Sequence, residues 1–321
     1  MGKHAFLITI DTEGDNLWRN HCHITTENTR FLPRFQALCE RYGFKPTWLT
    51  NYEMACDPAY IEFGKDVIAR KKGEIGMHLH AWNSPPESPL TDNDWFHQPY
   101  LIEYPDSVLR KKVIFMTELL EEKFQVKMRS HRAGRWAFDE RYASILAELD
   151  YHVDCSVTPH INWQFNPGSP QGNGGTNYTQ FPNKPYFIDL QDISRIGHSS
   201  LLEIPMSIHY KYPPLINKLK QATYRIRGKQ KSPAVNWLRP SKNNLAEMKR
   251  VVEMSIAEGQ DYVEFMLHSS EFMPGGSPTF VSEQDIELLY ENLEALFSWL
   301  TPRFFGQTLS EYYDVVIKRT P

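Results

Sequence analysis

Short apolar runs alternate with amphipathic segments along most of the chain. The runs have the length of buried strands, and the segments between them place apolar residues at helical spacing. The strands expected from this pattern cover 5–10, 46–51, 74–82, 127–131, 151–157, 201–208 and 262–267. The expected helices cover 28–42, 59–72, 107–124, 138–149, 242–258 and 283–300, and a capping box of Thr308 and Glu311 begins a last one. This alternation is typical of a parallel sheet or barrel.

Three long stretches interrupt the alternation. Residues 84–105 are rich in proline and aromatic side chains, and glycine, proline and asparagine dominate 159–200. A third stretch, 211–240, is strongly basic. Because long irregular insertions usually carry function, we expect these three to border a site.

Length and composition limit the possible classes of protein. At 321 residues and 41% hydrophobic content, the chain can build a large core. Length alone suggests about two domains, but α/β barrels of this length often form one unit. A net charge of −4 gives no global reason to expect nucleic acid as a partner. No apolar run reaches membrane-spanning length and no signal-peptide core precedes the first strand, so we expect a cytoplasmic protein.

His78 and His80 are the first candidates for chemistry. They follow a short apolar run and are two residues apart, so on an extended strand their side chains leave the same face. Neutral imidazole is the commonest protein ligand for transition metals. The pair therefore predicts a metal site, and the alternative is two hydrogen-bonded polar residues on a half-buried strand.

Reactive side chains also stand at the ends of other predicted strands. Asp11 and Glu13 follow the first strand, Arg132 follows the fourth, and His268 ends the last. In a parallel barrel these strand ends meet at one face. One carboxylate and two imidazoles leave a tetrahedral zinc ion an open position for water. A second carboxylate beside that water can act as the base, and a histidine across the site as the acid.

The order of these motifs resembles a known family. The segments are Ile10–Gly14, Glu74–His80, His131–Trp136 and Met266–His268. Together they resemble the motif series of the polysaccharide deacetylase family, or NodB homology domain, whose members are metal-dependent hydrolases of N-acetyl groups on sugars. The resemblance implies an α/β fold, a distorted (β/α) barrel of about seven parallel strands. It also implies one catalytic domain over residues 1–321, with the three insertions described above.

The resemblance implies a role for each candidate residue. Asp11 resembles the catalytic base, Arg132 the arginine that holds this base, and His268 the acid that protonates the departing amine. Glu13 and His78 stand at the places of metal ligands, and His80 is the natural third ligand. The implied cofactor is one divalent metal ion, most simply Zn²⁺.

The chain departs from the family pattern at several positions. Thr12 separates two acidic residues that are usually adjacent, which leaves Asp15 as a rival ligand. Trp82 stands where the second histidine of the usual His-x-x-x-His motif would be. The acid that normally tunes the acidic histidine has no clear match, and Glu271 or Asp154 are the candidates. These departures predict a substrate other than chitin or peptidoglycan.

The function expected from the motifs is metal-dependent hydrolysis of an amide. The substrate would be an N-acetyl or N-formyl aminosugar in a precursor of a surface polysaccharide, linked to a nucleotide or a lipid. One alternative is a glycan-binding protein that keeps the barrel and has lost the reaction. Another is a hydrolase of a non-sugar amide or cyclic imide, since fold alone does not decide the reaction.

The segment 211–250 has a charge of its own. It contains eleven Lys and Arg residues and one acidic residue, a net charge of +10, so the rest of the chain carries −14. We expect this basic segment to bind an anionic part of the substrate: a diphosphate linker, a uronic acid, or the membrane surface that carries a lipid-linked precursor. The alternative is a solvated surface loop. No motif supports nucleic acid as the partner.

Overall fold

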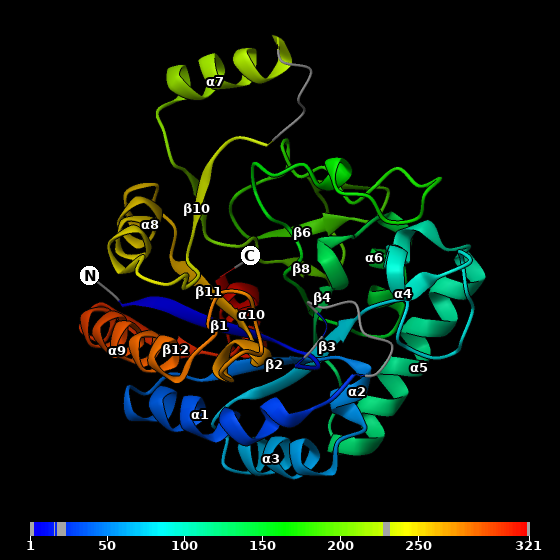
Figure 1. Ribbon diagram of the computed structural model, residues 1–321, viewed down its shortest axis with the longest axis horizontal. Helices are drawn as coiled ribbons and strands as arrows, with labels where there is room; N and C mark the ends of the chain where they lie inside the picture. The colour runs from blue at the N-terminus through cyan, green and yellow to red at the C-terminus, as the bar shows by residue number, and fades with distance from the viewer. Residues whose placement is uncertain (1–2, 16, 18–23, 227–231, 320–321) are drawn as a thin grey trace.

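The computed structural model describes residues 3–15, 17, 24–226 and 232–319, and its centre is a curled, mostly parallel sheet (Figure 1). In this part of the chain seven parallel strands follow one another in the order β11-β1-β2-β3-β4-β5-β8, and an eighth, β12 (Phe304–Gln307), pairs in parallel with β1. Their bounds are β1 His4–Thr12, β2 Pro46–Thr50, β3 Glu74–Leu79, β4 Ser130–Ala133, β5 Val153–Asp154, β8 Leu202–Glu203 and β11 Tyr262–His268. The expected distorted (β/α) barrel is thereby confirmed, in the form of an open half-barrel.

Helices cover the outer side of the sheet. Figure 1 shows α9, α1, α3 and α5 following one another around it. The helix bounds are α1 Leu32–Arg41, α2 Tyr52–Ala55, α3 Pro58–Ala69, α4 Asp94–His97, α5 Asp106–Phe124, α6 Glu140–Glu148, α8 Leu245–Ala257, α9 Glu283–Leu300 and α10 Leu309–Arg319. Every helix expected from the sequence is present, with ends shifted by a few residues.

Local signals in the sequence explain where these helices begin and end. Ser282 caps α9 by accepting a hydrogen bond from the Asp285 amide, and the Asp285 carboxylate accepts one from the Ser282 amide. Thr308 and Glu311 form the same reciprocal pair at the start of α10, as predicted. Gly43 follows α1 with φ of 71°, a left-handed conformation that glycine adopts without a steric cost.

The strand register brings the candidate residues together. In the parallel pairing of β1 with β11, Asp11 lies opposite His268. In the pairing of β3 with β4, His78 lies opposite Arg132. The aligned carboxyl ends of these four strands therefore form one wall of reactive side chains.

Several expected strands differ from the structure, and the expected strands 151–157 and 74–82 are shortened to Val153–Asp154 and Glu74–Leu79. The expected strand 201–208 is split into β8 and β9 (Ile208–Tyr210), with Pro205 between them. Proline has no amide proton to donate to a sheet, which explains the interruption. The expected strand 127–131 is shifted to Ser130–Ala133, so that Arg132 lies within β4 and not after it.

The insertions contain regular structure that the sequence pattern did not reveal. The stretch 159–200 holds an antiparallel hairpin of β6 (Tyr186–Asp189) and β7 (Asp192–Ile196), which extends the sheet beyond β8. Another missed strand, β12 (Phe304–Gln307), pairs with β1. These strands are too short to give a clear alternation of polar and apolar positions.

The first part of the basic segment 211–250, together with β9, forms an arm that stands away from the barrel. β9 pairs with β10 (Val235–Trp237) as an antiparallel ribbon, and between them lies α7 (Pro214–Ile226), at the top of Figure 1. Arg227, Lys229 and Lys231 of this segment lie outside the described residues. Among the residues described, no helix has the length and apolar character needed to cross a membrane.

An aromatic cluster joins α9 to the sheet. The Phe6 ring of β1 lies 4.7 Å from Phe44 and 5.7 Å from Phe297 of α9, measured between ring centroids. Leu293, one turn earlier in α9, is fully buried in the same core. Burial of this kind supplies most of the stability of a helix in a globular protein.

We predict that Leu293→Ala will lower the free energy of unfolding by about 2–5 kcal/mol, because it leaves a cavity in a packed core. The matched control is Leu288→Ala in the same helix, where the side chain is 37% exposed. The control should cost less than about 1 kcal/mol. Chemical denaturation of both variants measures the difference, and equal losses would contradict the packing described for α9.

Candidate metal centre

The strand ends surround a cavity of about 350 Å³. Asp11, Glu13, His78, His80 and His268 all line it. The first four are buried, and the His268 side chain is 12% exposed. The cavity therefore contains five of the six residues that the sequence singled out, and the sixth, Arg132, is buried directly behind Asp11.

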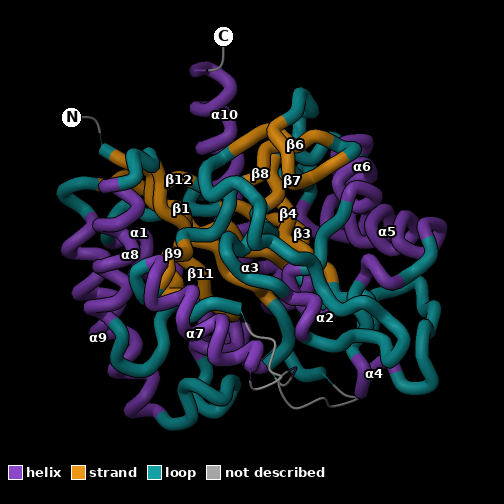
Figure 2. Tube along the Cα trace, turned by 90° about the horizontal axis from the view of Figure 1, so that it is seen from above, coloured by secondary structure: helices purple, strands orange, loops and turns teal. Residues whose placement is uncertain are grey.

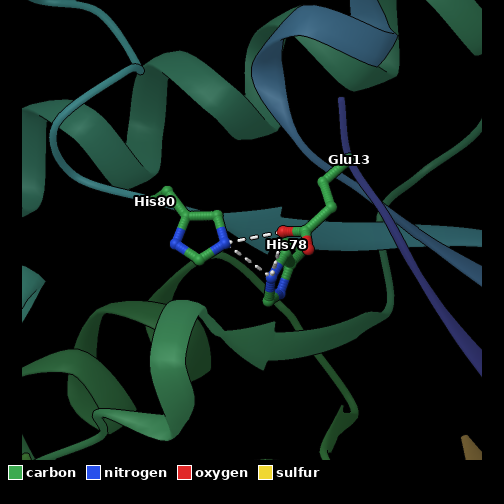
Figure 3. A group of neighbouring side chains, drawn as sticks. All are labelled: Glu13, His78 and His80. Carbon is green, nitrogen blue, oxygen red and sulfur yellow. Dashed lines mark hydrogen bonds and ion pairs between the residues drawn. The ribbon is translucent and has the colours of Figure 1, made fainter. Parts of the chain in front are cut away.

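Three of these side chains point toward one another (Figure 3). Glu13 Oε2 lies 2.8 Å from His80 Nε2 and 3.6 Å from His78 Nε2. The two Nε2 atoms are 3.2 Å apart. One carboxylate oxygen and two imidazole nitrogens thus lie within 4.8 Å of each other, a donor set that suits a divalent ion such as zinc.

The surroundings of His78 determine which of its two ring nitrogens carries the proton. Its Nδ1 lies 2.9 Å from the backbone carbonyl of Arg132, which can only accept a hydrogen bond. Nδ1 therefore carries the proton, and Nε2 presents a lone pair to Glu13 and His80. Metal-binding histidines are typically oriented in this way.

His80 is held differently. Its Nδ1 has no hydrogen-bond partner in the described part of the chain, but Trp82 packs on the ring with centroids 4.3 Å apart. On the other side is Gly134, where an added Cβ would lie 2.7 Å from His80 Nδ1 and would collide with the Leu79 carbonyl. Packing, not a second hydrogen bond, orients this imidazole.

Without a cation, the charges around the triad favour an ionised Glu13 and a neutral His80, and they favour the protonated form of His78. Burial acts to raise the pKa of Glu13, but His268, His78 and His80 outweigh it, and the pKa lies well below its usual value. Burial lowers the pKa of His80. Burial also acts to lower the pKa of His78, but Asp11 and Glu13 raise it overall. A bound cation would reverse that preference, because it competes with the proton for Nε2.

Asp11 is tied to the buried Arg132. Arg132 Nη1 donates to Asp11 Oδ1 at 2.5 Å, and Nη2 donates to Thr9 Oγ1 at 2.7 Å. Burial acts to raise the pKa of Asp11, but the guanidinium of Arg132 leads the opposing charges and the pKa lies below its usual value. Asp11 is therefore an ionised, oriented carboxylate that can accept a proton near neutral pH.

No protein-family model and no curated protein sequence matches this chain. Solved structures do match it. A candidate polysaccharide deacetylase from Mycobacterium smegmatis aligns over 99% of this chain and 92% of its own, with 14% identity and a TM-score of 0.57. A candidate glycoside hydrolase/deacetylase from Parabacteroides distasonis aligns over 99% and 72%, with 12% identity and a TM-score of 0.64.

The chain has the polysaccharide deacetylase fold. The fold resemblance inferred from the motifs is thereby confirmed. A 4-α-glucanotransferase from Thermococcus litoralis also aligns, over 98% of this chain and 40% of its own, with 13% identity and a TM-score of 0.54. Proteins described by different reactions therefore share the fold, and the reaction has to be argued from the site.

His268 lines the same cavity, next to Asp11 and Glu13. Its Nε2 lies 3.8 Å from Asp11 Oδ2 and 3.6 Å from Glu13 Oε1. Behind the ring, Glu271 Oε2 accepts a hydrogen bond from the His268 amide at 2.9 Å and lies 3.2 Å from Nδ1. Of the two candidates for the tuning acid, Glu271 is therefore the one in contact with His268. Asp154 was the wrong candidate, because it pairs with His131 at 2.6 Å.

Two residues of the site were missed by the sequence reasoning. Arg239 Nη2 donates to Glu271 at 3.1 Å and lies 3.0 Å from His268 Nδ1. Glu264 Oε1 accepts from Arg132 Nη2 at 2.5 Å, and burial raises the pKa of Glu264 to about 7. A glutamate in the middle of the apolar run 262–267 was a signal that could have been used, because a buried carboxylate needs a partner.

Asp15 lies outside the cluster of metal-ligating atoms. Its Oδ1 accepts a hydrogen bond from the Thr25 hydroxyl, which holds Asp15 in the turn after β1. Among the described residues, the group of potential ligands consists of Glu13, His78 and His80. The geometry thus favours His80 over Asp15 as the third ligand.

Aromatic residues and cations form the wall of the cavity. Trp82, Tyr100, Trp136 and Trp163 line it, together with Arg135 and Arg239. Tyr100 comes from the insertion 84–105 and Trp163 from 159–200, as expected of insertions that border a site. Arg135 and Trp136 have φ of 54° and 62°, a left-handed backbone that costs on the order of 1–3 kcal/mol for each such residue. Flat aromatic surfaces around a polar centre suit the faces of a sugar ring.

We predict that His80→Ala will strip a bound divalent metal ion, because it removes one of three ligands. Trp82→Phe should retain the metal, since it keeps an aromatic ring against His80. Asp15→Asn should retain it as well. Metal analysis of the purified proteins provides the measurement, and full occupancy in His80→Ala would show that the ligand set is wrong.

We also predict a pH-dependent contribution of Glu271 to stability. Burial acts to raise its pKa, but Arg239 and His268 lower it from 4.5 to about 2. A depressed pKa stabilises the fold above the unfolded value, here by about 3 kcal/mol, and this is lost as the pH falls from about 4.5 to about 2. The stability difference between wild type and Glu271→Gln should therefore be constant above pH ~5 and shrink below it.

Chemical denaturation at several pH values tests this expectation. Glu62→Gln, at an exposed position of α3, is the matched control and should show no such trend. A difference between wild type and Glu271→Gln that stays unchanged from pH ~5 to ~3 would contradict the assignment of Glu271 as an ionised partner of His268 and Arg239.

Proposed function

We propose that this protein is a metal-dependent amide hydrolase that removes an N-acyl group, acetyl or formyl, from an aminosugar. The observation that carries the proposal is the arrangement of Glu13, His78 and His80 on one side of a cavity that also contains Asp11 and His268. The deacetylase fold is consistent with this reaction.

The metal ion would be held by Glu13, His78 and His80, most simply as Zn²⁺. When bound, it would supply Lewis-acid chemistry, polarising the acyl carbonyl and acidifying a water molecule. Other divalent ions that prefer imidazole and carboxylate ligands would bind to the same three residues.

The other residues would handle the proton. Asp11 accepts a proton as a water oxygen bonds to the acyl carbon, and Arg132 keeps Asp11 ionised and oriented. His268 Nε2 delivers a proton to the sugar nitrogen as the carbon–nitrogen bond breaks. Glu271 and Arg239 hold the far side of the His268 ring, so that Nε2 faces the cavity. The products are a carboxylic acid and a free amine.

The walls of the cavity support an aminosugar as substrate. The aromatic residues offer stacking surfaces, and Arg135 and Arg239 offer hydrogen bonds to hydroxyl, phosphate or carboxylate groups. We infer a precursor of a surface polysaccharide, carried on a nucleotide or a lipid, because the basic segment 211–250 adjoins this cavity through Arg239.

A second candidate function is glycan binding without turnover. The observation that favours it is that His80 Nδ1 has no hydrogen-bond partner among the residues the structure describes, together with Trp82 at the position of the usual second histidine. A weakly held third ligand would leave a sugar-binding cavity without a resident metal. Metal analysis separates the two candidates, because only the hydrolase needs the ion.

We predict that Asp11→Asn will retain the metal and lose activity by ~100- to 10,000-fold, the usual contribution of one positioned base. His268→Ala should also retain the metal, with the largest loss on substrates that have a poor amine leaving group. Release of acetate and formate from a panel of N-acylated aminosugars, measured on metal-replete protein, is the assay. A near-normal rate for Asp11→Asn would exclude Asp11 as the base.

A further inference from the structure

Helix α7 exposes a continuous apolar stripe. Leu215, Leu219 and Ile226 are 71%, 62% and 86% exposed, and Ile216 is 42% exposed. The first three are spaced by four and seven residues, so they lie along one face of the helix. Large aliphatic side chains at this exposure are unfavourable in water, and a contiguous set of them marks an interaction surface.

The opposite face of α7 attaches the helix to its own segment. Asn217 is buried and donates a hydrogen bond to the Tyr212 carbonyl at 2.8 Å, while Lys220 lies over the Tyr212 ring at 3.6 Å. Figure 1 shows α7 standing outside the layer of helices that covers the sheet, and Figure 2 views the same helix from above. The apolar stripe is therefore the outward face of the arm.

The charge of the surrounding sequence indicates which kind of partner the apolar stripe binds. The sequence contains no acidic residue from 204 to 246, whereas the helix itself contains Lys218, Lys220 and Arg225. Basic residues and large aliphatic residues therefore alternate within the sequence of this one helix, and it has no acidic residue. This composition is typical of helices that lie in the interface of an anionic membrane.

We propose that α7 docks the protein on the surface of an anionic lipid bilayer, with Leu215, Leu219 and Ile226 inserted among the lipids. A second copy of this chain is a poorer partner. Pairing of two α7 helices would bring their lysines and arginines together without a carboxylate on either helix to compensate. Anionic headgroups provide that compensation, at about 1 kcal/mol per basic residue near the surface in general.

The arm is connected directly to the candidate site. β10 ends at Trp237, whose ring lies 5.6 Å from Trp136 of the cavity wall, and Arg239 follows two residues later beside His268. A membrane-bound α7 would therefore hold the cavity close to the lipid surface. This closeness to the lipid favours a lipid-linked glycan over a nucleotide-linked one as the substrate, an inference that rests on the proposed function.

Vesicle co-sedimentation of the full chain tests the docking. The vesicles are phosphatidylcholine alone and phosphatidylcholine mixed with phosphatidylglycerol. The wild-type protein should bind the anionic vesicles, and binding should weaken as salt increases. Leu215→Glu combined with Leu219→Glu should reduce binding at least about tenfold, because two inserted side chains are lost and two charges are repelled.

The matched control is Ile196→Glu combined with Val281→Glu, which alters two exposed apolar residues elsewhere and changes the net charge equally. It should bind as the wild type does. Absence of binding to anionic vesicles, or an equal loss in both double variants, would overturn the proposal. So would a wild-type dimer in sedimentation that the α7 variant abolishes, since a second copy would then cover the stripe.

Catalysis is measured separately. Release of acetate or formate from a water-soluble N-acylated aminosugar, without vesicles, should be equal in the wild type and the α7 variant. Vesicle binding requires no turnover, and this assay requires no membrane. Failure of the docking proposal can therefore be distinguished from failure of the proposed hydrolase function.

Discussion

One buried guanidinium organises the centre of this molecule. Arg132 has no exposed surface, and it donates to Asp11, Thr9 and Glu264, which come from β1 and β11. Burying an unpaired guanidinium would cost several kcal/mol. The position of Arg132 therefore depends on Asp11 and Glu264, and their positions depend on Arg132. Burial acts to raise the pKa of both carboxylates: that of Glu264 rises to about 7, whereas that of Asp11 stays below its usual value because Arg132 leads the opposing charges. The orientation of Asp11, the candidate base, therefore depends on β1, β4 and β11 together.

Arg132 also connects the candidate base to the candidate metal ligands. The Arg132 carbonyl fixes the Nδ1 proton of His78, while the Arg132 side chain fixes Asp11. A shift of β4 against β3 would therefore disturb both halves of the candidate site at once. On the far side, Glu271 and Arg239 provide comparable support for His268. Each reactive group is thus held in place by neighbouring side chains or backbone groups from other elements.

Much of this arrangement could be predicted from sequence, for a physical reason. In a parallel sheet, a reactive residue after an apolar run lies at the same edge as every other such residue, so Asp11, His78 and His268 could be brought together without coordinates. Arg239 could not, because it comes from a short ribbon with no periodic pattern. The helix within 211–240 was missed because Pro213, Pro214 and the dense basic residues were taken as signs of irregular structure, although proline is favoured at the first position of a helix. His80 was expected as a ligand, but its support by Trp82 and Gly134 depends on packing that only coordinates show.

The close approach of Gly134 to His80 has an evolutionary consequence. A side chain at 134 would occupy the space next to the imidazole and meet the Leu79 carbonyl. Because the Leu79 carbonyl belongs to the backbone, this collision would persist whatever side chain stood at 80. Glycine at 134 is therefore required independently of the candidate ligand, whereas position 80 can change while 134 stays glycine. A relative that has lost the imidazole at 80 should still keep glycine at 134.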